Sequence, residues 1–79
     1  MTEDQAARIQ QEILPAFGSV PNGEPFLTFG IWVLPFKRGG AGSEVFLVDR
    51  KITSEADYRK AKQEVADKLK QLIAGPAIG

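Results

Sequence analysis

Residues 26–36, FLTFGIWVLPF, are the most apolar stretch of the chain and decide its fold. The stretch contains the single Trp, and it is rich in β-branched and aromatic residues, so the sequence predicts a β-strand. Successive side chains of a strand point to opposite faces. A strand with one face in water would alternate apolar and polar residues, and this one does not. We therefore expect both of its faces to be covered.

A returning strand is predicted at residues 44–50, EVFLVDR, after the glycine-containing segment KRGGAGS at residues 37–43. The two strands would form an antiparallel hairpin with a flexible loop. If that loop centres near Gly40, Trp32 lies opposite Val48 and Leu34 lies opposite Phe46. Gly30 then faces Arg50, a position suited to a β-bulge.

Two helices are predicted on either side of the hairpin in the sequence. The first covers residues 2–14, with Thr2 and Gln5 as a capping box, and it ends or kinks at Pro15 before finishing by Gly18. The second covers residues 54–74, begins at a Ser54 cap and ends before Gly75-Pro76. The expected buried stripes follow helical spacing and contain Ala6, Ile9, Ile13 and Phe17, and then Tyr58, Ala61, Val65, Leu69, Leu72 and Ile73.

The element order is therefore α-β-β-α, or α-β-β-β-α if residues 18–20 form a short strand before the turn at residues 19–25. Two helices on one face of a hairpin make a small two-layer α+β domain, which we expect to span residues 1–79. The opposite apolar face would stay bare, which favours a symmetric dimer, sheet on sheet or edge to edge through residues 26–29. The alternative is that a longer sheet or a crossed helix covers that face within one chain.

Composition limits the chemistry of the chain. Cys and His are both absent among the 79 residues, so disulfides, thiolate or imidazole metal sites and the commonest general base are excluded. We expect no enzymatic activity, no metal, no cofactor and no small-molecule substrate. The polar, acidic first residues are unlike a secretory signal, and no apolar run is long enough to cross a bilayer, so a cytoplasmic protein that does not enter membranes is expected.

The preferred hypothesis is a non-catalytic protein–protein interaction module, which forms a homodimer or acts as a small inhibitor or adaptor of a larger protein, as proteins of phages and mobile elements do. Aromatic residues dominate the energetics of protein interfaces. The predicted contact residues are Phe29, Trp32, Leu34, Phe36 and Phe46, with Lys37 and Arg38 at the rim.

The alternative hypothesis is nucleic-acid binding through a basic helix face. Basic residues are concentrated between the end of the hairpin and the start of the second helix. Ten basic residues balance ten acidic ones, and this zero net charge weighs against a nucleic-acid partner. The candidate contacts are Arg50, Lys51, Arg59, Lys60 and Lys62.

Overall fold

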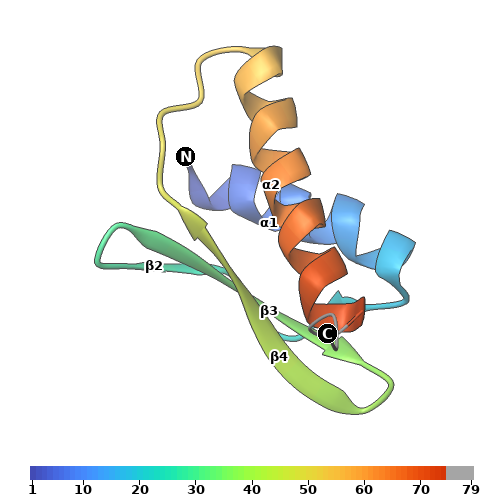
Figure 1. Ribbon diagram of the computed structural model, residues 1–79. Helices are drawn as coiled ribbons and strands as arrows, with labels where there is room; N and C mark the ends of the chain where they lie inside the picture. Colours follow the sequence, from blue (N-terminus) through green and yellow to red (C-terminus); the bar gives the residue numbers. More distant parts are fainter. Residues whose placement is uncertain (75–79) are drawn as a thin grey trace.

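The computed structural model describes residues 1–74. Two helices lie on one face of a four-stranded antiparallel sheet, and this arrangement confirms the predicted two-layer α+β class (Figure 1). The sheet has more strands than the hairpin expected from the sequence. In chain order the elements are α1 (Glu3–Ile13), the 3₁₀ helix η1 (Leu14–Phe17), β1 (Val20–Pro21), β2 (Phe26–Thr28), β3 (Ile31–Arg38), β4 (Ala41–Val48) and α2 (Glu55–Ala74).

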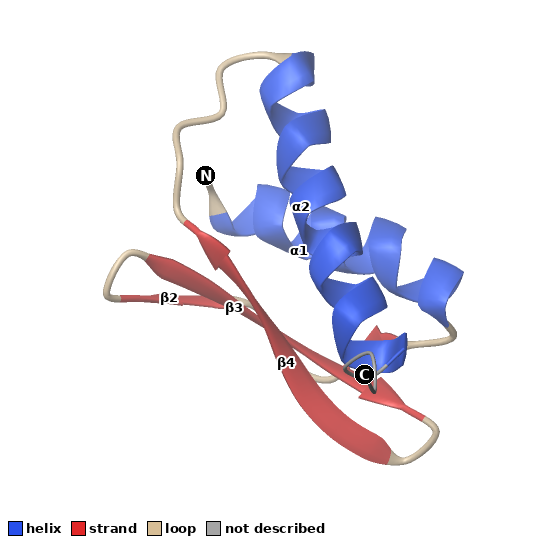
Figure 2. Ribbon diagram, viewed as in Figure 1, coloured by secondary structure: helices blue, strands red, loops and turns tan. Residues whose placement is uncertain are grey.

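Strand β3 is the centre of the sheet (Figure 2). It pairs with β4 along its whole length on one side, and with β1 and then β2 on the other. Pro35 lies between the part of β3 that pairs with β2 and the part that pairs with β1. Its missing backbone N–H therefore removes no hydrogen bond between strands. Its carbonyl accepts hydrogen bonds from the Asn22 backbone N–H at 3.1 Å and from Gln10 Nε2 at 2.7 Å. The sheet is therefore tied to α1 at the point where the ladder is interrupted.

The apolar stretch predicted as one strand is broken by a tight turn. Phe29 and Gly30 have φ values of 49° and 75°, and they connect β2 to β3 as a two-residue hairpin loop. Such a loop requires positive φ at both of its positions when it is of type I′. The single strand and the bulge expected at Gly30 are therefore wrong. The turn was hidden because Phe rarely occupies a left-handed position.

The second turn sets the register of β3 against β4. Gly39 and Gly40 have φ values of 59° and 95°, so two residues suffice to reverse the chain. Trp32 consequently lies opposite Leu47, and Leu34 lies opposite Val45. The expected pairs with Val48 and Phe46 are wrong by one residue. A slip of one residue moves every side chain of a strand to the other face.

Helix α1 begins and ends as its sequence predicts. The Thr2 N–H donates to Gln5 Oε1 at 2.9 Å and the Gln5 N–H donates to Thr2 Oγ1 at 3.2 Å, which completes the capping box. The α-helix stops before Pro15, continues as η1, and ends at Gly18 with a φ of 66°. In the stripe, Ala6 and Ile9 are fully buried, while Ile13 and Phe17 are only partly buried.

Helix α2 begins after Ser54, whose Oγ accepts a hydrogen bond from the Asp57 N–H at 3.2 Å. The predicted stripe is buried from Tyr58 to Leu69. Leu72 was expected in that stripe but is 51% exposed. The predicted stop at Gly75-Pro76 lies outside the described residues.

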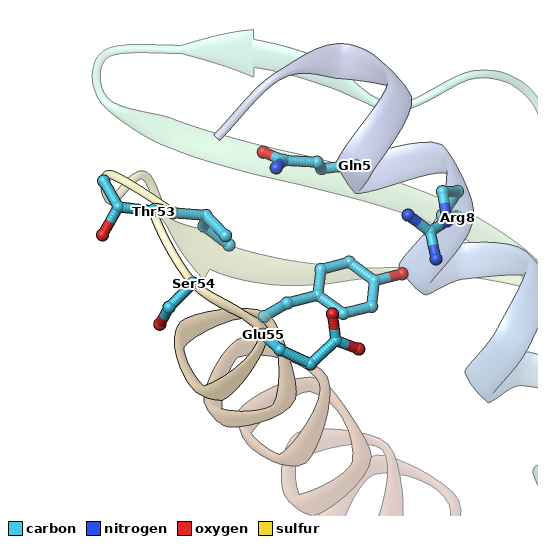
Figure 3. A pocket seen from close by; sticks show the side chains of 7 residues that line it. Gln5, Arg8, Thr53, Ser54 and Glu55 are labelled. Atoms are coloured by element: carbon cyan, nitrogen blue, oxygen red, sulfur yellow. The ribbon is translucent and has the colours of Figure 1, made fainter.

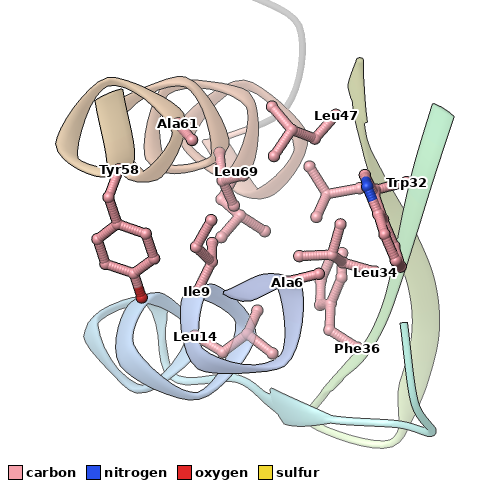
Figure 4. Close-up of a cluster of buried hydrophobic side chains, with 12 residues drawn as sticks. Ala6, Ile9, Leu14, Trp32, Leu34, Phe36, Leu47, Tyr58, Ala61 and Leu69 are labelled. Atoms are coloured by element: carbon pink, nitrogen blue, oxygen red, sulfur yellow. The ribbon is translucent and has the colours of Figure 1, made fainter. Parts of the chain in front are cut away.

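The core fills the space between the two helices and the inner face of the sheet (Figure 4). Strand β3 contributes every second residue to it, and β4 contributes two more. No buried side-chain nitrogen or oxygen in the described chain lacks a hydrogen-bond partner. The buried cluster consists of Ala6, Ile9, Leu14, Trp32, Leu34, Phe36, Val45, Leu47, Tyr58, Ala61, Val65 and Leu69.

Candidate interaction surface

The face of the sheet that points away from α1 and α2 is a candidate interaction surface. Paired residues of neighbouring strands share a face, and residues next to a core residue in a strand point to the other face. In the described part of the chain both helices lie on the inner side (Figure 2). We call this surface the outer face; it carries Val20, Phe26, Ile31, Val33, Lys37, Glu44, Phe46 and Val48.

An aromatic row crosses the middle of the outer face. Val33 on β3 pairs with Phe26 on one side and with Phe46 on the other. The two Phe residues are 48% and 52% exposed, whereas Val33 between them is only 4% exposed. Val33 has no helix above it in the described chain, and we attribute its burial to the aromatic side chains that flank it. The row therefore presents aromatic surface to solvent.

The apolar surface continues to the tip of the β2–β3 hairpin. The next row contains Ile31, which pairs with Val48, and both are exposed. Beyond that row lies Phe29, which is 100% exposed and is the one non-glycine residue with positive φ in the described chain. A left-handed backbone costs a non-glycine residue about 1–2 kcal/mol. The hairpin tip thus combines backbone strain with a fully solvated aromatic side chain.

The exposed aromatic area is large for a chain of this size. Phe26, Phe29 and Phe46 together expose the equivalent of two whole phenylalanine residues, or about 300–500 Å². The largest apolar patch on a typical monomer is about 300–600 Å² and is often functional. The summed area of these three residues, two on the outer face and one at the hairpin tip, falls in that range before Ile31 and Val48 are added.

The structure divides the contact residues predicted from the sequence between two locations. Phe29 and Phe46 are on the surface. Trp32, Leu34 and Phe36 are at most 5% exposed and belong to the core. These three residues are therefore not available to a partner, and the predicted contact face is corrected at their positions. The sequence reasoning missed Phe26, Ile31 and Val48. The adjacent glycines at positions 39 and 40, taken as the whole turn, would have placed Val48 opposite Ile31. Phe26 reaches the outer face only through the turn at Phe29 and Gly30.

The charged residues predicted at the rim lie at the other end of the sheet. Lys37 is exposed in the outermost row of the outer face, opposite Gly42. Glu44 is exposed in the neighbouring row, opposite Pro35. Arg38 is also exposed and precedes the Gly39–Gly40 turn. The outer face is therefore aromatic at its centre and at the β2–β3 tip, and charged with both signs near the β3–β4 tip.

The five basic residues proposed for nucleic-acid contact do not form one uniformly basic surface. Arg50 is paired with Glu64, and Lys62 Nζ lies 3.2 Å from Glu12 Oε1. Lys51, Arg59 and Lys60 are exposed. Pairing with carboxylates reduces the positive potential that a phosphate backbone requires.

A polar cluster at the contact of α1 and α2 borders a shallow pocket (Figure 3). The Tyr58 hydroxyl donates a hydrogen bond to Glu12 Oε1 at 2.9 Å, and the Arg8 guanidinium lies 4.9 Å from the centre of the Tyr58 ring. Burial, reinforced by Glu12, raises the pKa of Tyr58 to about 12. The hydrogen bond from Tyr58, and then that from Lys62, lowers the pKa of Glu12. At neutral pH the Tyr58 hydroxyl is neutral and the Glu12 carboxylate is ionised, and the hydrogen bond between them links α2 to α1. The pocket is lined by Gln5, Arg8, Ile52, Thr53, Ser54, Glu55 and Tyr58.

A second polar contact fixes the end of the sheet. Asp49 Oδ1 accepts hydrogen bonds from Trp32 Nε1 at 2.9 Å and from the Met1 amine at 3.0 Å. The bond from Trp32, followed by that from the amine, lowers the pKa of Asp49. The indole nitrogen of the core tryptophan is thereby satisfied, which holds Trp32 in its orientation.

Within residues 1–74, no three His, Cys, Asp or Glu side chains are grouped so that they could hold a metal ion. Neither described helix combines the length and apolarity needed to cross a membrane. Searches of family models, curated proteins and solved structures returned no match to this chain.

Proposed function

We propose that this chain is a non-catalytic protein–protein interaction module that binds another protein chain through its outer face. It does so as a homodimer or as a small inhibitor or adaptor of a larger protein. The observation that carries this proposal is the solvent-exposed aromatic surface formed by Phe26, Phe46 and Phe29 on a sheet whose other face is already covered by helices.

The size of the surface supports a protein partner. A standard interface buries about 800 Å² on each partner, and about 57–65% of that area is apolar. Phe26 and Phe46 on the outer face, together with Phe29 at the hairpin tip, expose an apolar area of this order, about 300–500 Å². Mixed charges at one end, Lys37 and Glu44, resemble the polar rim of such interfaces.

The chemistry of the outer face does not suit a nucleic acid. Most protein–DNA hydrogen bonds go to phosphate and sugar, and they come chiefly from Lys, Arg and polar side chains. The outer face carries one cation, Lys37, next to one anion, Glu44. Aromatic stacking platforms for single strands are combined with a positively charged groove, which this face does not offer in the described chain.

Site-specific photocrosslinking tests the proposal. Benzoylphenylalanine replaces Phe46 in the full chain, which is produced in its native host and irradiated before purification. The matched control carries the same group at Leu72, which is exposed to a similar degree on α2. The adducts are identified by mass spectrometry.

We expect a discrete protein adduct from position 46 and none, or a far weaker one, from position 72. An adduct with the same chain and an adduct with a different protein both support the proposal. Adducts of equal yield from both positions, or no protein adduct from position 46, would contradict it.

A further inference from the structure

We infer that the protein chain bound at the outer face is a second copy of this chain, packed sheet on sheet about a two-fold axis parallel to β3. This inference rests on the proposed function and adds the identity of the partner and the geometry of the contact. It follows from the features that disfavour pairing at the edges of the sheet, the symmetry of the aromatic row, and the position of the two charges.

Both edges of the sheet carry features that disfavour pairing with another strand. Alternate residues of β4 turn their backbone groups away from β3, and the carbonyl of Phe46 is occupied by Lys68 Nζ from α2. The opposite edge consists of β1, which has two residues including Pro21, and β2, which has three. Lysine, proline and short strands are the devices that prevent edge pairing. These features favour association through the outer face over pairing at an edge.

The aromatic row matches itself under a two-fold axis. Phe26 and Phe46 lie on opposite sides of Val33 in one row. An axis parallel to β3 above Val33 exchanges the two sides of the sheet, so Phe46 of each copy lies opposite Phe26 of the other. Aligned sheets pack in this way with their strands within about 30°. The contact then contains two identical aromatic pairs at its centre.

The charges select this axis over the perpendicular one. Lys37 and Glu44 occupy neighbouring rows near the β3–β4 tip, and Phe29 lies at the opposite end. An axis parallel to β3 brings like ends together, so the two Lys37 side chains, which lie on β3 itself, meet near the axis, and each also comes within reach of Glu44 of the other copy. A perpendicular in-plane axis would place these charges over the apolar β2–β3 end and desolvate them without partners.

The stability of so small a domain also favours a second copy. Chains below about 70–80 residues rarely gain enough free energy from one core and commonly rely on disulfides, metals or oligomerisation. This chain of 79 residues has no Cys and no His. Burial of the outer face in a dimer would supply the missing apolar area.

A charge-exchange experiment tests the geometry. The full-length Lys37→Glu and Glu44→Lys variants are studied separately and as an equimolar mixture by sedimentation velocity. In a homodimer of either variant, positions 37 and 44 carry the same charge, so both predicted ion pairs become like-charge contacts. In the mixed dimer, positions 37 and 44 of the two copies again carry opposite charges in both pairs. We expect each variant alone to dissociate about 5- to 30-fold more readily than wild type and the mixture to recover wild-type affinity.

Two further variants make the outcome decisive. Phe46→Glu should raise the dissociation constant at least about 30-fold, as expected for a central contact residue, and the matched Leu72→Glu variant should leave it unchanged. Circular dichroism establishes that each variant is folded. A wild-type chain that stays monomeric up to millimolar concentration overturns the second-copy inference. Two other results also overturn it: a dimer that is disrupted by Leu72→Glu and not by Phe46→Glu, or a mixture of the two charge variants that does not regain affinity. A monomer that still gives a position-46 adduct with a different protein retains the proposed function, so the two failures are distinguishable.

Discussion

The two faces of β3 are both apolar in sequence, yet the structure uses them differently. The inner side chains Trp32, Leu34 and Phe36 are almost completely buried beneath α1 and α2. On the outer side, Ile31 remains in contact with solvent, and so do Phe26 and Phe46, which flank the buried Val33. The difference comes from the helices and not from the strand, because in the described residues 1–74 amphipathic helices cover only one face. Inner residues therefore stabilise the fold, and outer residues are available for association.

This comparison predicts that equivalent truncations on the two faces have different effects. Leu34→Ala removes a side chain that is 1% exposed and should cost about 2–5 kcal/mol of unfolding free energy, which is enough to unfold much of a small domain. Val48→Ala, at 57% exposure, should change stability by no more than about 0.5 kcal/mol. Urea titrations in the Phe46→Glu background, where association does not contribute, measure both. Similar losses from the two truncations would show that the faces do not differ as described.

The second prediction concerns the contact between the two helices that cover the inner face. The unfolded chain releases the Tyr58 proton near pH 10, whereas the folded chain holds it until about pH 12. Between these values the folded state binds more protons, so its stability falls as pH rises, by up to about 1.4 kcal/mol per pH unit. Below pH 10 this group causes no change.

Thermal unfolding of wild type and Tyr58→Phe at a series of pH values between neutral and strongly alkaline isolates this effect. The variant lacks the ionisable hydroxyl, so the difference in stability between the two proteins should shrink as the pH rises above 10. A difference that stays constant across this range would mean that Tyr58 is not protonated preferentially in the folded state.

The third prediction separates stability from binding at the hairpin tip. Phe29→Asn places a residue that tolerates left-handed φ next to Gly30, the pair preferred in type I′ turns. We expect the unfolding free energy to rise by about 0.5–1 kcal/mol and self-association to weaken, because the exposed aromatic ring is lost. Chemical denaturation and sedimentation measure the two quantities. Lower monomer stability in the variant would refute the strain assigned to Phe29.

The smallest effect is expected away from both faces, on the exposed basic surface of α2. The double variant Arg59→Glu with Lys60→Glu should alter stability by no more than about 0.5 kcal/mol and leave association unchanged. The nucleic-acid hypothesis predicts instead that the wild-type chain binds duplex or single-stranded nucleic acid with a steep salt dependence. Loss of such binding in the double variant would favour that alternative over a protein-binding outer face.

Local signals in the sequence predicted most of the fold. Thr2 with Gln5, Pro15 with Gly18, and Ser54 with Asp57 fix helix ends through contacts within a few residues, and the structure contains each of them. The helical spacing also located most of the buried stripe of both helices. These features were predictable because neighbours in sequence determine them.

The register of the sheet was not predictable in the same way. Treating residues 37–43 as a loop centred the turn on Gly40, whereas the turn is centred between Gly39 and Gly40. The pairing was therefore wrong by one residue, which exchanged the faces of β4 against β3. Phe29 is a poor turn residue by propensity, so the β2–β3 hairpin left little trace in the sequence. As a result Trp32, Leu34 and Phe36 were expected at the interface but lie in the core, whereas Phe26 was overlooked.

The molar mass in solution, measured by light scattering behind a sizing column from micromolar to millimolar concentration, tests the central claim most directly. We predict a mass approaching twice the 8.6 kDa of one chain, and a Phe46→Glu variant that is folded and has the mass of a single chain. A wild-type mass that stays at one chain throughout this range would contradict self-association through the outer face.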